Sequence, residues 1–110
     1  MPVAVLTIAM ALIGTSFDSR AEDLPLFVIE MNDGAIAPLR LEVPAKRPFK
    51  IELRNKGTTP AEFESRELRR EKVLAPQSTS FIVIRTLDPG EYPFFDDFHP
   101  DAPQAVLVAK

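Results

Sequence analysis

The sequence predicts an all-β fold, a sandwich of about seven to eight short strands. Eleven prolines stand against four glycines in the 110 residues, and proline breaks helices but suits turns and strand edges. Apolar and polar residues alternate in several segments, with the period of two that is typical of half-buried strands. Turn residues separate these segments at the short, regular spacing of a β-sandwich.

The first 21 residues are set apart from the rest by an apolar run. Residues 3–14 read VAVLTIAMALIG, which is shorter than the roughly 20 residues needed to span a bilayer. Ser19 and Ala21 follow with the small side chains that signal peptidase prefers. We therefore expect residues 1–21 to be a cleaved signal peptide and residues 22–110 to be the mature domain, located in the bacterial periplasm. The alternative is a hydrophobic first strand.

The predicted strands then follow one another to the end of the chain. The first is an apolar run, the next two alternate strictly as LRLEV and FKIELR, and the others are short apolar or alternating segments between turns. Turns are expected at residues 32–34, 44–48, 55–57, 75–77 and 88–90, where Asn, Asp, Gly and Pro gather. The predicted strands are 26–31, 39–43, 49–54, 62–65, 71–74, 80–85, 91–95 and 105–109.

Composition excludes several function classes. A net charge of −3 is too acidic for a protein that binds nucleic acid through phosphate contacts. The absence of cysteine excludes disulfides, thiolate zinc sites, iron–sulfur clusters and a cysteine nucleophile. The sequence also lacks a G-x-S-x-G motif and a phosphate-binding glycine loop, so hydrolase and transferase functions find no support.

The densest group of potential ligands lies near the C-terminus. Asp96, Asp97 and Asp101 stand within six residues of one another, together with His99, the single histidine of the chain. Carboxylates combined with one imidazole suit iron or copper(II) and, less specifically, manganese. The alternative interpretation is an acidic turn that carries a surface histidine.

A second pair of carboxylates lies on a predicted strand. Glu62 and Glu64 have strand spacing, so their side chains point to one face while Phe63 points to the other. Two adjacent carboxylates repel each other, and a cation relieves that repulsion. The alternative is a solvated outer strand face, and the residues do not decide which glutamate would be the ligand.

Residues 90–99, GEYPFFDDFH, resemble the C-terminal ligand loop of cupredoxins, which reads G-x-Y-x-F-x-C-x-x-H. The resemblance puts Asp96 in the place of the copper-binding cysteine and His99 in that of the second histidine. Ala61 occupies the position of the first histidine, and Gln104 stands where the axial methionine usually falls. A blue-copper centre requires a thiolate, so this chain is not expected to be a blue-copper electron carrier.

The chain is also similar to the cupredoxin-like domain of EfeO-type and FtrB-type proteins of bacterial iron uptake, on AEFE at 61–64, VLAP at 73–76 and LDPGEY at 87–92. This resemblance implies a cupredoxin-like Greek-key β-sandwich with a metal site that includes an acidic residue near Glu62 and the residue at position 96. It implies a copper or iron ion as cofactor and, as enzymatic role, at most a metal-dependent oxidation of ferrous iron. The implied partners are an inner-membrane iron permease and a companion periplasmic iron-binding protein.

From these observations we expect a periplasmic metal-binding protein of a ferrous iron uptake system. Its predicted ligands are Asp96, His99 and a glutamate from Glu62 or Glu64, with Asp97 and Asp101 as further candidates. Two other functions stay open. One is a copper chaperone or storage protein with the same ligands, and the other is a metal-free sandwich that acts as an interaction module.

Overall fold

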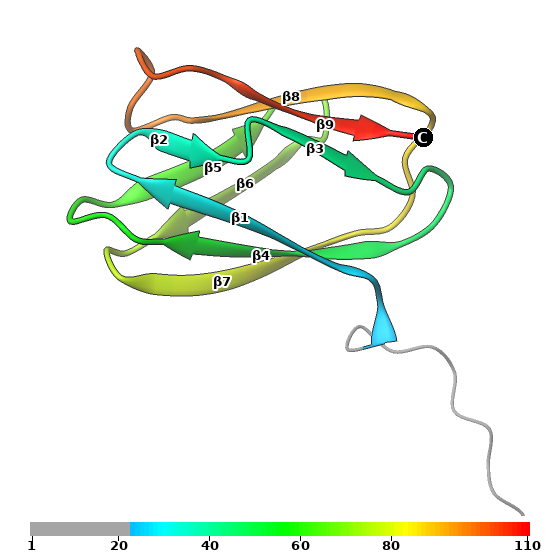
Figure 1. The fold of residues 1–110 in the computed structure, drawn as a ribbon, viewed down its shortest axis with the longest axis horizontal. Coiled ribbons are helices and arrows are strands. Elements are labelled where there is room, and N and C mark those ends of the chain that lie inside the picture. The colour runs from blue at the N-terminus through cyan, green and yellow to red at the C-terminus, as the bar shows by residue number, and fades with distance from the viewer. Residues whose placement is uncertain (1–22) are drawn as a thin grey trace, which may run out of the picture.

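A computed structural model describes residues 23–110, which form two β-sheets packed face to face (Figure 1). The predicted signal peptide, residues 1–21, lies outside the described residues. Between residues 23 and 110 there is no α-helix, and so no helix that could cross a membrane. The nine strands are β1 (Leu26–Asn32), β2 (Ala35–Ala37), β3 (Arg40–Val43), β4 (Phe49–Asn55), β5 (Ala61–Ser65), β6 (Arg70–Leu74), β7 (Ser78–Ile84), β8 (Gly90–Asp96) and β9 (Ala105–Ala109).

The predicted all-β sandwich is confirmed, with one strand more than expected. All eight predicted strands are present, and their ends differ from the prediction by two residues at most. The additional strand is β2, which has only three residues, between Gly34 and Pro38. So short a segment shows no readable alternation in the sequence, and it forms because the 33–34 turn folds it back against β1.

The two sheets contain both parallel and antiparallel pairs. One sheet has the order β2-β1-β4-β7 and the other β3-β9-β8-β5-β6. β1 pairs with β4 in parallel, β3 pairs with β9 in parallel, and the remaining pairs are antiparallel. The C-terminal strand therefore lies inside its sheet, between β3 and β8.

The core lies between the sheets and follows from strand alternation. Every second residue of β4 is buried, beginning with Phe49, Ile51 and Leu53. From the facing sheet, Phe63 and Phe94 are fully buried, with ring centroids 5.1 Å apart. Aromatic and branched side chains of this kind remove the most apolar surface from water and so contribute most to stability.

Three connections meet at one end of the sandwich, on the left in Figure 1. They are the β1–β2 turn, the β4–β5 loop and the β8–β9 loop, and hydrogen bonds join the first two through Asp33 and the last two through His99. Most of the residues that the sequence singled out lie at this end of the sandwich.

Candidate metal centre

Glu62 and Glu64 lie on the outer face of β5. The strand alternates strictly, so Ala61, Phe63 and Ser65 are buried in the sandwich while the two glutamates face outward, partly exposed. This is the arrangement that the sequence spacing predicted for the pair.

Asp97 joins the two glutamates from the end of β8. Its backbone N–H donates to the carbonyl oxygen of Glu62 at 2.9 Å, which holds the start of the β8–β9 loop against β5. One carboxylate oxygen from each of Glu62, Glu64 and Asp97 can lie within 4.8 Å of the other two. These three side chains, called the carboxylate cluster below, are spaced closely enough to share a cation.

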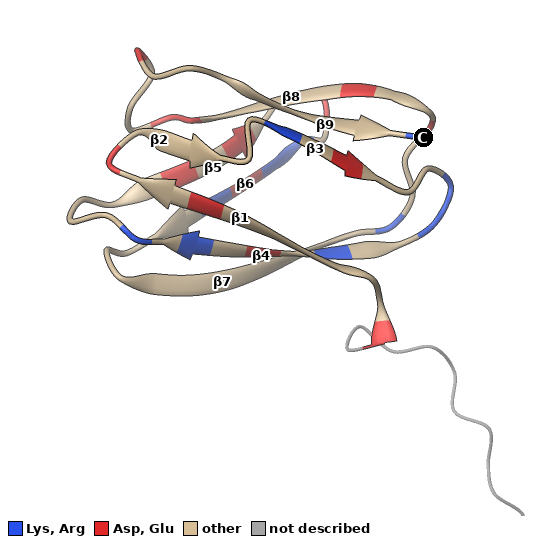
Figure 2. Cartoon of the chain, in the orientation of Figure 1, with Lys and Arg blue, Asp and Glu red and all other residues tan. Residues whose placement is uncertain are grey.

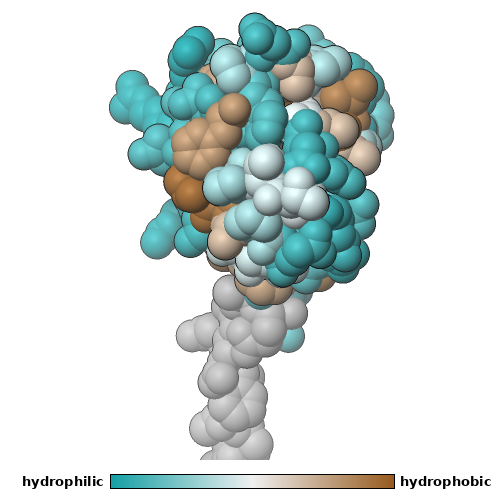
Figure 3. Space-filling model, turned by 90° about the vertical axis from the view of Figure 1, so that its left-hand side faces the viewer, coloured by the Kyte–Doolittle hydropathy of each residue, from teal (hydrophilic) through white to brown (hydrophobic). Residues whose placement is uncertain are grey.

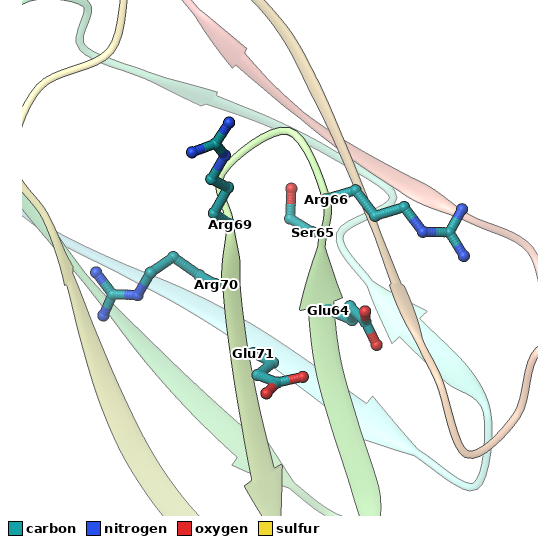
Figure 4. A pocket seen from close by; sticks show the side chains of 6 residues that line it. All are labelled: Glu64, Ser65, Arg66, Arg69, Arg70 and Glu71. Atoms are coloured by element: carbon teal, nitrogen blue, oxygen red, sulfur yellow. The ribbon is translucent and has the colours of Figure 1, made fainter.

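The surroundings of the carboxylate cluster are also acidic. Glu71 on β6 is the cross-strand partner of Glu64, and both side chains appear in Figure 4. The pKa of Glu62 is raised, first by burial, then by a hydrogen bond with Asp97 and by the negative charges of Glu71, Asp97 and Glu64. Acidic residues of β5, of the β1–β2 turn and of the β8–β9 loop gather at this end of the molecule (Figure 2). A bound cation would offset this repulsion.

Asp96, next in sequence to Asp97, points the other way, into the sandwich. Its side chain is fully buried, and each of its oxygens has a donor. Oδ1 accepts from the backbone N–H groups of Glu62 and Phe98, both at 3.0 Å. Oδ2 lies 2.8 Å from Nδ1 of His99. Three donors of this kind satisfy a buried carboxylate without a metal ion.

His99 connects Asp96 to the β4–β5 loop. Its Nε2 lies 3.2 Å from Oγ1 of Thr59, and Thr59 Oγ1 lies 2.6 Å from Oδ1 of Asp33. Asp33 also accepts the backbone N–H groups of Thr58 and Thr59, each at 3.0 Å. The pKa of Asp33 is lowered, mainly by the Thr59 hydroxyl hydrogen bond.

The structure thus divides the predicted site residues into two groups. Glu62, Glu64 and Asp97 lie together on the outer face, whereas Asp96 and His99 lie together between the loops. Asp101 is exposed and, within residues 23–110, has no hydrogen bond or ion pair with either group.

Sequence reasoning missed two members of the inner group, Asp33 and Thr59. Asp33 was noted only as part of a turn, because its contacts are with residues 25 and 26 positions away. No pattern in the sequence predicts a contact between Asp33 and a residue so far along the chain.

A pocket also lies at the β5–β6 turn. It is lined by Glu64, Ser65, Arg66, Arg69, Arg70 and Glu71. The arginines do not converge, because Arg69 and Arg70 point to one side and Arg66 to the other (Figure 4). Arg70 donates to the carbonyl oxygen of Val83 and Arg66 lies over the Phe95 ring, so both are used in packing and the pocket is not built for an anion.

Comparison with known proteins identifies the family. A family model described as a cupredoxin-like domain matches residues 3–109. The chain belongs to the cupredoxin-like domain family. An uncharacterized protein of Rickettsia prowazekii (strain Madrid E) is 35% identical over 82 residues, which are 74% of this chain and 66%, just under two thirds, of the relative.

Solved structures agree on the fold. A reduced auracyanin from Roseiflexus castenholzii superposes with a TM-score of 0.66 at 13% identity, covering 77% of this chain and 96% of that one. A purple cupredoxin from Nitrosopumilus maritimus gives a TM-score of 0.58 at 16% identity, covering 76% and 98%. At such identities the likeness establishes the cupredoxin fold alone.

The resemblance to cupredoxins puts Ala61, Asp96, His99 and Gln104 at the ligand positions, and these side chains do not fit a copper ion. Ala61 offers a buried methyl group and no ligand. Asp96 and His99 are engaged with each other, Asp96 also binds backbone N–H groups, and Gln104 is exposed. The chain contains no cysteine, so the thiolate of a blue-copper centre is absent.

Proposed function

We propose that this cupredoxin-like protein is exported to the bacterial periplasm and binds iron there as part of a ferrous iron uptake system. The observation that carries the proposal is the convergence of Glu62, Glu64 and Asp97, one oxygen each within 4.8 Å. The resemblance to EfeO-type and FtrB-type domains supports iron as the cargo, with an inner-membrane permease and a companion iron-binding protein as partners.

The chemistry of the carboxylate cluster suits this role. Carboxylates are hard ligands and favour harder, more highly charged cations. A set of three would stabilise ferric over ferrous iron and lower the potential of the couple. The protein would thereby assist the oxidation of ferrous iron or hold the ion for transfer. Figure 3 shows the end of the molecule that lies on the left in Figure 1, where hydrophilic surface surrounds separate apolar patches.

A metal-free interaction module is the second candidate. It is favoured by the closed hydrogen bonding of Asp96 and His99, which satisfies the inner group without any ion. In that case the acidic face of β5 and β6 would contact a partner protein instead of a cation.

The test is anaerobic titration with iron(II), using processed protein purified from periplasm. The wild type is compared with Glu62→Gln/Glu64→Gln, which keeps the shape of both side chains and removes their charge. We expect binding to weaken by at least about tenfold, or 1.4 kcal/mol. Glu67→Gln is the matched control, because Glu67 is exposed on the neighbouring turn and is outside the cluster. Unchanged affinity in the double variant would refute the site.

The role in uptake is tested separately by growth in iron-limited medium. A strain that lacks the protein should grow poorly, and the wild-type gene should restore growth while the double variant should not. Full restoration by a variant that no longer binds iron would contradict the iron-uptake role.

A further inference from the structure

Two residues that the cupredoxin resemblance puts at copper-ligand positions, Asp96 and His99, bond here to each other and, through Thr59, to Asp33. Asp96 and His99 come from the β8–β9 connection, Thr59 from the β4–β5 loop and Asp33 from the β1–β2 turn. They form one series of contacts: His99 Nδ1 lies 2.8 Å from Asp96 Oδ2, His99 Nε2 lies 3.2 Å from Thr59 Oγ1, and Thr59 Oγ1 lies 2.6 Å from Asp33 Oδ1. This series of contacts joins three connections that are far apart in sequence.

Both ring nitrogens of His99 are engaged in this series of contacts. Carboxylates accept hydrogen bonds only, so Thr59 Oγ1 donates to Asp33 Oδ1 and Nδ1 of His99 donates to Asp96 Oδ2. Nε2 of His99 faces Thr59 Oγ1 at 3.2 Å. A metal ion could bind either nitrogen only after breaking one of these contacts.

Independent packing evidence shows that the loops are built around these contacts. A Cβ at Gly57 would lie 2.6 Å from both the backbone nitrogen and Oδ1 of Asp33. A Cβ at Gly34, whose φ is +97°, would lie 3.2 Å from the Cβ of His99. Only glycine permits so close an approach at these two points.

Asn55 fixes the same loop from inside the sandwich. Its side chain is 1% exposed, and its Nδ2 donates to the carbonyl oxygens of Thr59, Leu74 and Ala75. Its Oδ1 accepts the backbone N–H of Gly57. One buried side chain therefore links the loop that carries Thr59 to the end of β6 and to the turn after it.

We propose that Asp33, Thr59, Asp96 and His99 form a metal-independent latch, which takes the structural place of the copper ion and holds the three connections together. Asp96 and His99 then serve as positioning residues rather than metal ligands. The proposal does not rest on iron binding at the carboxylate cluster. The four side chains of the latch lie between the three connections, whereas the side chains of the carboxylate cluster lie on the outer face of β5.

The first test is amide hydrogen exchange of the full protein in the presence of EDTA. Thr59→Val keeps the side-chain volume but removes the hydroxyl that links Asp33 to His99. We expect exchange at the amides of Phe98 and Glu62, which donate to Asp96, to accelerate by about tenfold or more. Thr58→Val is the matched control, because the Thr58 hydroxyl contacts Asp33 alone, at 3.2 and 3.5 Å.

Two results would overturn the latch. One is unchanged exchange at Phe98 and Glu62 in Thr59→Val. Phe98 is the stricter probe, because Asp96 and His99 link it to Thr59, whereas Glu62 lies only three residues from Thr59 in the sequence. The other is loss of their protection in the wild type when metal is removed. Asp33→Asn, which alters the far end of the same chain of contacts, repeats the test if Thr59→Val does not fold.

The second test is a copper(II) titration of Glu62→Gln/Glu64→Gln/Asp97→Asn, in which the latch is intact and the outer carboxylates are neutral. The latch predicts no stoichiometric copper binding in this variant. Binding that disappears on the further change His99→Gln would show that the latch opens to metal and would refute the proposal. If the carboxylate cluster does not bind iron, the results expected from the hydrogen-exchange test and from the copper(II) titration stay the same.

Discussion

Glu62 is the described carboxyl group whose pKa is raised, and its surroundings explain why. Burial, the hydrogen bond with Asp97 and the charges of Glu71 and Glu64 all disfavour its ionised form. The raised pKa means that the folded protein holds this proton more tightly than the unfolded chain, whose glutamate has the ordinary pKa of 4.5, so the folded state loses stability as pH rises from 4.5 through the folded-state pKa.

Glu62→Gln should therefore stabilise the metal-free protein at pH 7, by about 0.5 kcal/mol, the size of a like-charge cross-strand pair. The gain should vanish below pH 4.5, where both the folded and the unfolded forms are protonated. Urea denaturation at pH 7 and pH 4, in EDTA, measures both values. Equal urea midpoints for wild type and variant at pH 7 would contradict the described electrostatics.

Asp96 should matter for stability without any metal. Asp96→Asn replaces an oxygen that faces His99 or a backbone donor with an amide group, inside a fully buried site. The loss of charge-assisted bonds should cost about 1–3 kcal/mol of unfolding free energy. Asp101→Asn, an exposed change on the same loop, should stay within about 0.5 kcal/mol. If the two variants unfold at the same urea concentration, Asp96 is not the buried anchor described here.

The sequence showed the ligand-like residues but not their grouping. Asp96, Asp97 and His99 are close along the chain, yet Asp96 continues the inward alternation of Phe94 while Asp97 begins a loop and turns to β5. Glu62 and Glu64 were correctly placed on one face because both lie within a strand, where the period of two applies. Past the end of a strand, no such rule exists.

At the scale of elements, the β4–β5 loop depends on residues that the sequence marked only as a turn. Asn55 and Gly57 were recognised as turn formers, but their long-range partners Leu74 and Asp33 were not. The longer strands could be predicted because the alternation of apolar and polar residues is a local pattern. Strand β2 was not predicted, because its three residues are too few to show that alternation.

Asn55→Ala should destabilise the protein by about 3 kcal/mol, since it leaves the carbonyl oxygens of Leu74 and Ala75 and the N–H of Gly57 without this partner. Lys56→Ala, an exposed neighbour in the same loop, should change stability by about 0.5 kcal/mol or less. Denaturant titration compares the two. A small effect of Asn55→Ala would mean that the loop is held by other contacts.

At the level of the whole molecule, the chain has a cupredoxin-like fold but lacks the cysteine that a blue-copper centre requires. Copper(II) added to the protein should give only weak d–d absorption, without the intense visible charge-transfer band of a thiolate–copper site, because the chain has no cysteine. A visible absorption spectrum is sufficient to test this. An intense blue colour would require a set of ligands other than those described.

Export is a prediction about residues outside the described part of the chain. If residues 1–21 are a signal peptide, the protein from periplasm should begin near Glu22. Intact-mass spectrometry of the purified protein measures this directly. A mass that includes residues 1–21 would contradict cleavage.

We propose that a metal ion binds the outer carboxylates Glu62, Glu64 and Asp97, and not Asp96 and His99, which the resemblance puts at cupredoxin ligand positions. Pulsed electron paramagnetic resonance of the copper(II)-loaded protein tests it most directly, because His99 is the single imidazole in the chain. We predict a spectrum of oxygen ligands without modulation from an imidazole nitrogen, and loss of the bound signal in Glu62→Gln/Glu64→Gln/Asp97→Asn. Imidazole modulation in the wild type that disappears in His99→Gln would contradict the account.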